Sequence, residues 1–115
     1  MAEYRSIKNP ELGELSFYAN LGALGEFEDY YGKPWYSLLG NATKKMWFIL
    51  LHKCYEVACK RRKEEIKYTV EDFILYFTKS DYESIVPVIE KDLMDEMGID
   101  LEKLGEKKTQ SKAKK

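Results

Sequence analysis

Residues 21–32, with Pro34 shortly after them, constrain the fold of this chain more than any other segment. Gly32 and Pro34 end a helix, because glycine takes the left-handed cap and proline cannot extend the hydrogen-bond ladder. The segment carries no chemically reactive group, so it predicts a packed helix over residues 21–31 of a binding module rather than part of an enzyme. Four large apolar residues, spaced three, three and four apart, share one face of this helix: Leu21, Leu24, Phe27 and Tyr31.

An extended segment is predicted before this helix. A rival interpretation is one helix from a cap at Asn9 to Tyr31, but three glycines oppose it, each costing about 1 kcal/mol relative to alanine inside a helix. We therefore expect a loosely held arm over residues 1–13, then a short strand or extended stretch. The strand is predicted because apolar residues alternate with polar ones there: Leu15, Phe17 and Ala19.

Further helices are predicted after a single turn over residues 34–39. The main helix, about 43–63, is capped by Asn41 or Thr43, and its last turn is basic. The next helix begins at Thr69 with acidic residues in its first turn, and Phe73, Tyr76 and Phe77 are expected on its inner face.

The last helix contains Pro87 and is expected to end at Gly98. A capping box over residues 80–83 predicts its start, but Pro87 leaves open whether it is kinked or begins at 87. The fold class predicted is all-α: one domain over residues 14–98 with four to five helices, with or without one short N-terminal strand. The expected core comprises Leu24, Phe27, Leu50, Cys54, Val57, Phe73, Phe77, Ile85 and Ile89.

Composition and charge narrow the class of protein. A chain of 115 residues, 44% of them apolar and 14% aromatic, can bury a core without disulfides or metals. From Ile99 onward six lysines accompany three acidic residues, so a basic tail of net +3, expected to be disordered, follows a body of net −4. The acidic body disfavours nucleic acid as the ligand. With no signal peptide or long apolar run, a cytoplasmic protein is expected.

No residue pattern predicts catalysis, a metal or another cofactor. His52, Cys54 and Cys59 do not bring three ligands to one helix face, and a zinc site needs three or four. A packed or half-exposed histidine and two buried free thiols are expected instead. The basic cluster of residues 60–67 could meet a phosphate, although a solvated helix end explains it better; the cluster comprises Lys60, Arg61, Arg62, Lys63 and Lys67.

The aromatic residues suggest a protein-binding surface. One small core is not expected to bury all of them, and tyrosine and tryptophan bury large area at low entropy cost when a partner binds. The candidates straddle the turn into the main helix and its outer edge: Trp35, Tyr36, Trp47 and Tyr55.

The chain resembles the tail assembly chaperones of long-tailed bacteriophages and prophages over residues 15–98. The similar features, in order, are an extended Leu15-Ser-Phe-Tyr, a helix ending Phe27-Glu-Asp-Tyr-Tyr-Gly, a turn with Leu38-Leu39, Leu50-Leu51-His52, the cap Tyr68-Thr-Val-Glu-Asp and a final Met97-Gly98.

The resemblance implies a non-catalytic protein that acts inside the bacterial host and is absent from the mature virion. Such chaperones coat the long helical tape measure protein and recruit tail tube protein. We expect no small-molecule substrate and no binding to a membrane, and we leave open whether the protein self-associates. The alternative is a small helical nucleic-acid-binding or regulatory protein that uses residues 60–67.

Overall fold

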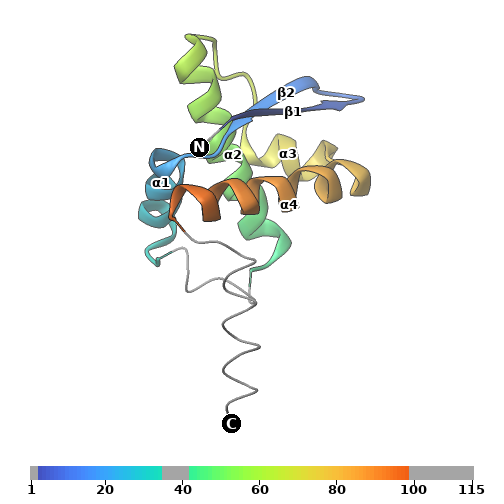
Figure 1. Ribbon diagram of the computed structural model, residues 1–115. Coiled ribbons are helices and arrows are strands. Elements are labelled where there is room, and N and C mark those ends of the chain that lie inside the picture. The colour runs from blue at the N-terminus through green and yellow to red at the C-terminus, as the bar shows by residue number, and fades with distance from the viewer. Residues whose placement is uncertain (1–2, 35–41, 99–115) are drawn as a thin grey trace.

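The computed structural model describes residues 3–34 and 42–98. Four helices form most of this part, and a two-stranded antiparallel sheet precedes them (Figure 1). The domain is therefore mostly helical, as predicted. It is not all-α, because its first two elements are strands that pair with each other. The elements are β1 (Tyr4–Asn9), β2 (Gly13–Tyr18), α1 (Leu21–Tyr31), α2 (Lys44–Arg62), α3 (Val70–Tyr76) and α4 (Lys79–Glu96).

The hairpin corrects the prediction of a loose arm over residues 1–13. β1 pairs with β2 from Tyr4 opposite Tyr18 to Asn9 opposite Gly13. The Asn9 side chain closes the turn, because its Oδ1 accepts hydrogen bonds from the backbone N–H groups of Glu11 and Leu12, each at 2.8 Å. Asn9 thus shapes a turn rather than capping a helix, so the rival prediction of one helix from Asn9 is also wrong.

Strand β2 and helix α1 follow the sequence prediction. The inward residues of the alternating segment are buried, with Leu15 at 1% exposed and Phe17 at 0%. Asn20 caps α1 by accepting a hydrogen bond from the N–H of Ala23 at 2.9 Å. Gly32 ends the helix in the left-handed conformation, at φ 76°, as its position before Pro34 predicts.

Helix α2 lies at the centre of the domain and contacts the sheet and every other helix. Its cap is Thr43, whose Oγ1 accepts a hydrogen bond from the N–H of Met46 at 3.2 Å. At its other end Lys63 adopts a left-handed conformation, at φ 57°. The predicted turn over residues 34–39 and the alternative cap Asn41 fall almost wholly outside the described residues.

Helices α3 and α4 begin at caps of the same kind. Thr69 caps α3 and Thr78 caps α4, in each case with an aspartate three residues later that bonds back to the cap. The start predicted at residues 80–83 is therefore two residues late, because Thr78 and Asp81 form the capping box. Pro87 lies inside α4, which runs through it to Glu96.

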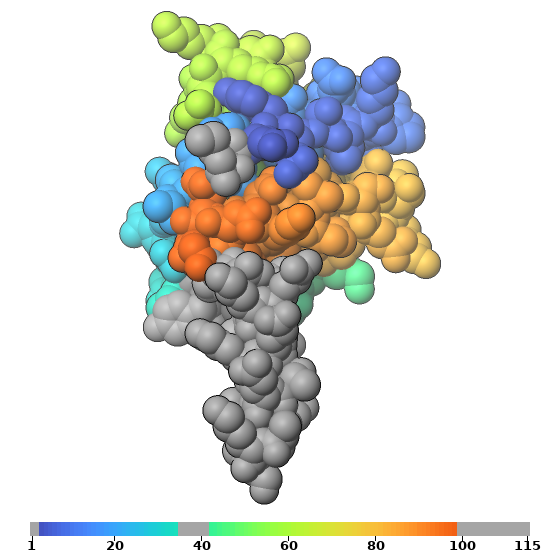
Figure 2. All heavy atoms as spheres, viewed as in Figure 1, coloured from blue at the N-terminus to red at the C-terminus, as the bar shows by residue number. Residues whose placement is uncertain are grey.

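Helix α4 packs beside the hairpin, and the two lie side by side on the face seen in Figure 2. Arg5 of β1 joins them, since its guanidinium bonds to the buried carboxylate of Asp92. Asn9 adds a second link, donating from Nδ2 to the Asp81 carboxylate at 2.7 Å and to the Tyr76 carbonyl at 2.8 Å. Polar contacts thus fix the hairpin against the C-terminal helices.

The hydrophobic core contains nearly all of the predicted residues. Val57 and Phe77 are only partly buried and pack against the core. Cys54 and Cys59 are buried and free, as expected. The predicted inner face of α3 is wrong at Tyr76, which is 43% exposed. The other predicted core residues are buried: Leu24, Phe27, Leu50, Cys54, Phe73, Ile85 and Ile89.

Candidate interaction surface

Helix α3 exposes three consecutive large apolar side chains, which we call the α3 patch. Leu75 is 71% exposed, and its neighbours Ile74 and Tyr76 are 42% and 43% exposed. Single exposed apolar residues are ordinary, whereas contiguous ones indicate a binding surface. The α3 patch is therefore the candidate interaction surface of the described residues.

One buried ring anchors α3 beneath this patch. Phe73 is fully buried and stacks on Phe77, with ring centroids 4.9 Å apart. It also makes edge contacts with rings from two other elements, Phe17 of β2 at 6.1 Å and His52 of α2 at 5.3 Å. A seven-residue helix has little stability by itself, so this anchor is what holds the patch in place.

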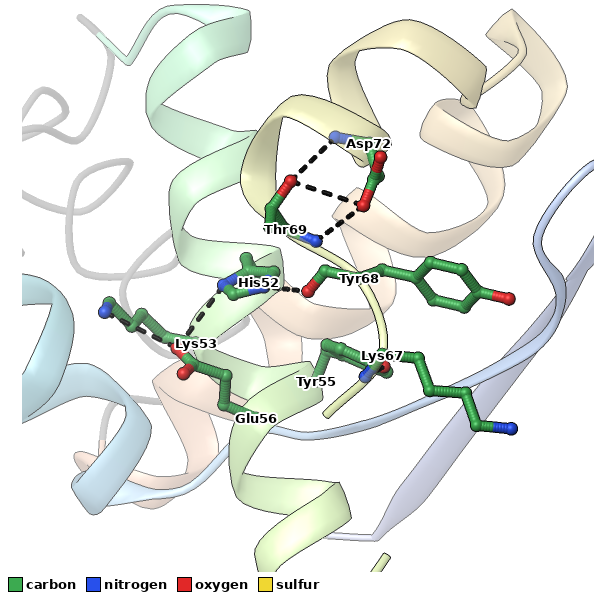
Figure 3. Close-up of polar contacts among 8 residues, drawn as sticks. All are labelled: His52, Lys53, Tyr55, Glu56, Lys67, Tyr68, Thr69 and Asp72. Atoms are coloured by element: carbon green, nitrogen blue, oxygen red, sulfur yellow. Dashed lines mark hydrogen bonds and ion pairs between the residues drawn. The ribbon is translucent and has the colours of Figure 1, made fainter. Parts of the chain in front are cut away.

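The cap of α3 fixes where the helix begins (Figure 3). The Asp72 carboxylate accepts a hydrogen bond from the N–H of Thr69 at 2.9 Å, and the Asp72 N–H donates to the Thr69 hydroxyl at 3.3 Å. This reciprocal arrangement satisfies backbone donors that the first turn leaves without helical partners. The patch therefore sits on a helix with a defined start.

The segment before α3 is tied to α2 by two side chains (Figure 3). His52 Nε2 lies 2.7 Å from the Tyr68 carbonyl oxygen and donates to it, because a carbonyl can only accept. The Tyr55 hydroxyl accepts the N–H of Lys67 at 2.9 Å. Burial raises the pKa of the Tyr55 hydroxyl, because it disfavours the ionised form.

His52 therefore has a structural position, as the sequence predicts for a packed histidine. Its Nδ1 lies 3.3 Å from the Glu56 carboxylate, which also lies 3.5 Å from the Lys53 ammonium. Among the described residues, no group of three or more potential ligands could hold a metal ion. The chemistry around His52 is that of a support for α3.

The structure describes two of the four aromatic candidates from the sequence, Trp47 and Tyr55. Trp35 and Tyr36 lie outside the described residues. Trp47 and Tyr55 are only 8% and 5% exposed, so the expectation that they lie on an outer edge is wrong. Both sit on α2, which is enclosed by neighbouring elements and has little outer face to offer.

A signal for the α3 patch was present in the sequence. Residues 73–77 read Phe-Ile-Leu-Tyr-Phe, five consecutive large apolar side chains. On a helix, consecutive residues point in different directions, so they cannot all face one core. Some of them had to be exposed, and the structure places Ile74, Leu75 and Tyr76 outside.

The basic cluster at the end of α2 contacts the hairpin. The Arg61 guanidinium lies 4.1 Å from the Tyr18 ring centroid, and its Nε donates to the Tyr4 hydroxyl at 3.2 Å, which raises the pKa of Arg61. Arg62 lies 4.2 Å from the Tyr4 ring centroid and donates to the Ser16 hydroxyl at 2.9 Å. Two cations of the cluster thus hold aromatic rings of the sheet.

The fold and the surface define a mostly helical domain with a two-stranded sheet and exposed apolar residues on α3. Comparison with protein-family models, with curated proteins and with solved structures gives no match. In the part of the chain that the structure describes, no helix has the length and hydrophobicity needed to cross a bilayer.

Proposed function

We propose that this protein is a tail assembly chaperone of a long-tailed bacteriophage or prophage, which binds the helical tape measure protein and helps recruit tail tube protein. The observation that carries the proposal is the α3 patch, in which the consecutive residues Ile74, Leu75 and Tyr76 are all exposed. Large apolar side chains on a fixed support suit an amphipathic helix, which lays its apolar face on such a surface. The protein would act without catalysis in the host cytoplasm and leave before the virion is complete.

The order of elements along the chain also supports this proposal. The extended segment, the helix ending at Gly32 and the cap at Thr69 are the features on which the resemblance to these chaperones rests, and each occurs as a strand or helix boundary. The partner's identity comes from the resemblance alone, so the experiment must test the partner directly.

Co-purification tests the proposal. The tagged full-length chain should be expressed with the tape measure protein encoded in the same genome, and the soluble fraction of that protein should rise. A tail tube protein from the same genome, added to the complex, should be retained. A tape measure protein that stays insoluble and uncaptured would contradict the proposal.

The alternative is a regulatory protein that binds nucleic acid through residues 60–67. It has less support, because Arg61 and Arg62 already contact Tyr4 and Tyr18. Nucleic-acid binding through such a cluster would weaken steeply as salt is raised. A salt-dependent mobility shift with DNA, combined with no capture of the tape measure protein, would favour this alternative.

A further inference from the structure

An open pocket of about 540 Å³ lies between β2, the end of α2 and residues 64–68. Three consecutive residues of β2 line it, namely Glu14, Leu15 and Ser16. Successive strand residues point to opposite faces of a sheet, so a pocket lined by all three must touch the edge of the strand. Because β1 pairs with the other edge, the pocket is a groove along the unpaired edge of β2, which we call the β2 groove.

The unpaired edge presents free backbone groups to this groove. In an antiparallel pair, alternate residues direct their N–H and C=O groups away from the neighbouring strand. At least one of Glu14, Leu15 and Ser16 therefore directs both its backbone N–H and its backbone C=O into the groove. Within the described residues, the backbone of these three forms no hydrogen bond outside the pairing with β1. Such an edge is a template for an added strand.

The size and floor of the groove suit a short peptide. Its volume falls within the range of about 300–1,000 Å³ that is usual for ligand pockets. Tyr55, Cys59 and Tyr68 line it together with Leu15, and polar groups make up the larger share of its accessible lining. Residues 64–68 form the opposite wall. An extended segment would thus lie between β2 and this wall.

The charges around the groove select a basic occupant. Glu14, Glu64 and Glu65 line it, all three are exposed, and none forms an ion pair with a described residue. Two cations also line it, Arg62 and Lys67, so three carboxylates face two positive charges and the lining carries a net charge of −1. The one carboxylate in excess favours lysine or arginine in the occupant.

We propose that the β2 groove binds an extended segment of a partner protein, in which basic residues alternate with small apolar ones, as a third strand on the free edge of β2. The apolar side chains would face Tyr55 and Tyr68, and the basic ones would meet the carboxylates at the rim. This site is separate from the α3 patch and does not depend on the tape measure protein as partner.

A peptide titration of the ¹⁵N-labelled full-length chain tests the proposal. The probe is a short peptide in which lysine alternates with valine. Its addition should shift the amide signals of residues 14–16 and 64–68 and leave those of α1 unchanged. A peptide of the same sequence with an N-methyl group on every residue has no backbone N–H left to pair as a strand and should not bind. Equal binding of the methylated peptide, or no shift with the first peptide, would overturn the proposal.

Matched charge variants test the choice of occupant. Glu64→Gln with Glu65→Gln should weaken binding of the lysine–valine peptide by several-fold up to about tenfold, as expected for two solvent-exposed ion pairs. Glu26→Gln with Glu83→Gln removes two exposed carboxylates elsewhere and should leave binding unchanged. Equal effects of the two pairs, or equal binding of a glutamate–valine peptide, would contradict a basic occupant. The same amide shifts on concentrating the protein alone would show that a second copy fills the groove, which would also overturn the proposal.

Discussion

The guanidinium of Arg5 donates two hydrogen bonds to the carboxylate of Asp92, from Nε at 2.8 Å and from Nη2 at 2.9 Å. The pair joins the first strand to the last helix. Asp92 is 3% exposed, so its charge is shielded from water and depends on Arg5 for compensation.

Loss of Arg5 should therefore destabilise the whole domain. Arg5→Ala leaves the Asp92 carboxylate buried without its partner, and we expect the free energy of unfolding to fall by about 2–3 kcal/mol. Lys8→Ala, an exposed position on the same strand, serves as the control and should change it by less than about 0.5 kcal/mol. Urea unfolding followed by circular dichroism measures both; equal effects would mean that the pair contributes little.

Two neighbouring positions on α3 should respond in opposite ways. Phe73→Ala removes a fully buried ring and is expected to cost about 3–5 kcal/mol of stability. Leu75→Ala removes a side chain that is 71% exposed and should cost less than about 0.5 kcal/mol. Thermal or urea unfolding of the two variants checks the orientation of α3, and similar losses would show that its faces are misassigned.

His52 should control the order of the segment that leads into α3. His52→Leu removes the donor to the Tyr68 carbonyl, and loss of one such hydrogen bond costs about 0.5–1.5 kcal/mol. Amide hydrogen exchange over residues 66–70 should become faster, while exchange in α1 stays unchanged. Lys60→Ala, at an exposed position of α2, is the control; equally fast exchange in both variants would argue against this role for His52.

The two thiols should differ in reactivity. Burial raises the pKa of both Cys54 and Cys59, and only the thiolate reacts with alkylating agents. Cys54 is 0% exposed and Cys59 is 7% exposed and lines the β2 groove. Near neutral pH we expect slow alkylation of Cys59 and none of Cys54 until the protein unfolds. Mass spectrometry after iodoacetamide treatment measures this, and fast labelling of Cys54 in the folded protein would contradict its burial.

The helices were predictable because their signals are local. The helix over residues 21–31, its stop at Gly32 and the cap at Thr69 each follow from signals within a few residues, and the structure confirms all three. The predicted apolar face of that helix is wrong at Leu21, which is 57% exposed. The burial of Leu15 and Phe17 follows in the same way from their alternation. Such patterns need no knowledge of the rest of the chain.

The first strand could not be predicted from the sequence of its own segment. Tyr4–Asn9 has no strong alternation, and only its pairing with β2 and its contacts with residues far along the chain hold it in place. Arg5 bonds to Asp92 and Asn9 bonds to Asp81. These partners are more than seventy residues away, so a pattern within the segment carries no sign of them.

Two residues of the expected aromatic surface were misplaced for a related reason. Large aromatic residues serve both cores and interfaces, and residue type alone does not separate the two uses. Trp47 and Tyr55 lie on a helix that other elements surround, whereas large side chains on the outer helices α1 and α3 are exposed, among them Tyr30 and Leu75. Only the packing around α2 decides whether its aromatic residues belong to the core or to an interface.

Capture of a tape measure protein by two serine variants tests the central claim most directly. Leu75→Ser alters the α3 patch, and Leu21→Ser alters a leucine that is 57% exposed on α1. Circular dichroism should show both variants folded. Loss of the contact of one leucine should weaken capture by Leu75→Ser roughly tenfold or more, while Leu21→Ser should capture as the original chain does. Undiminished capture by Leu75→Ser would contradict the account.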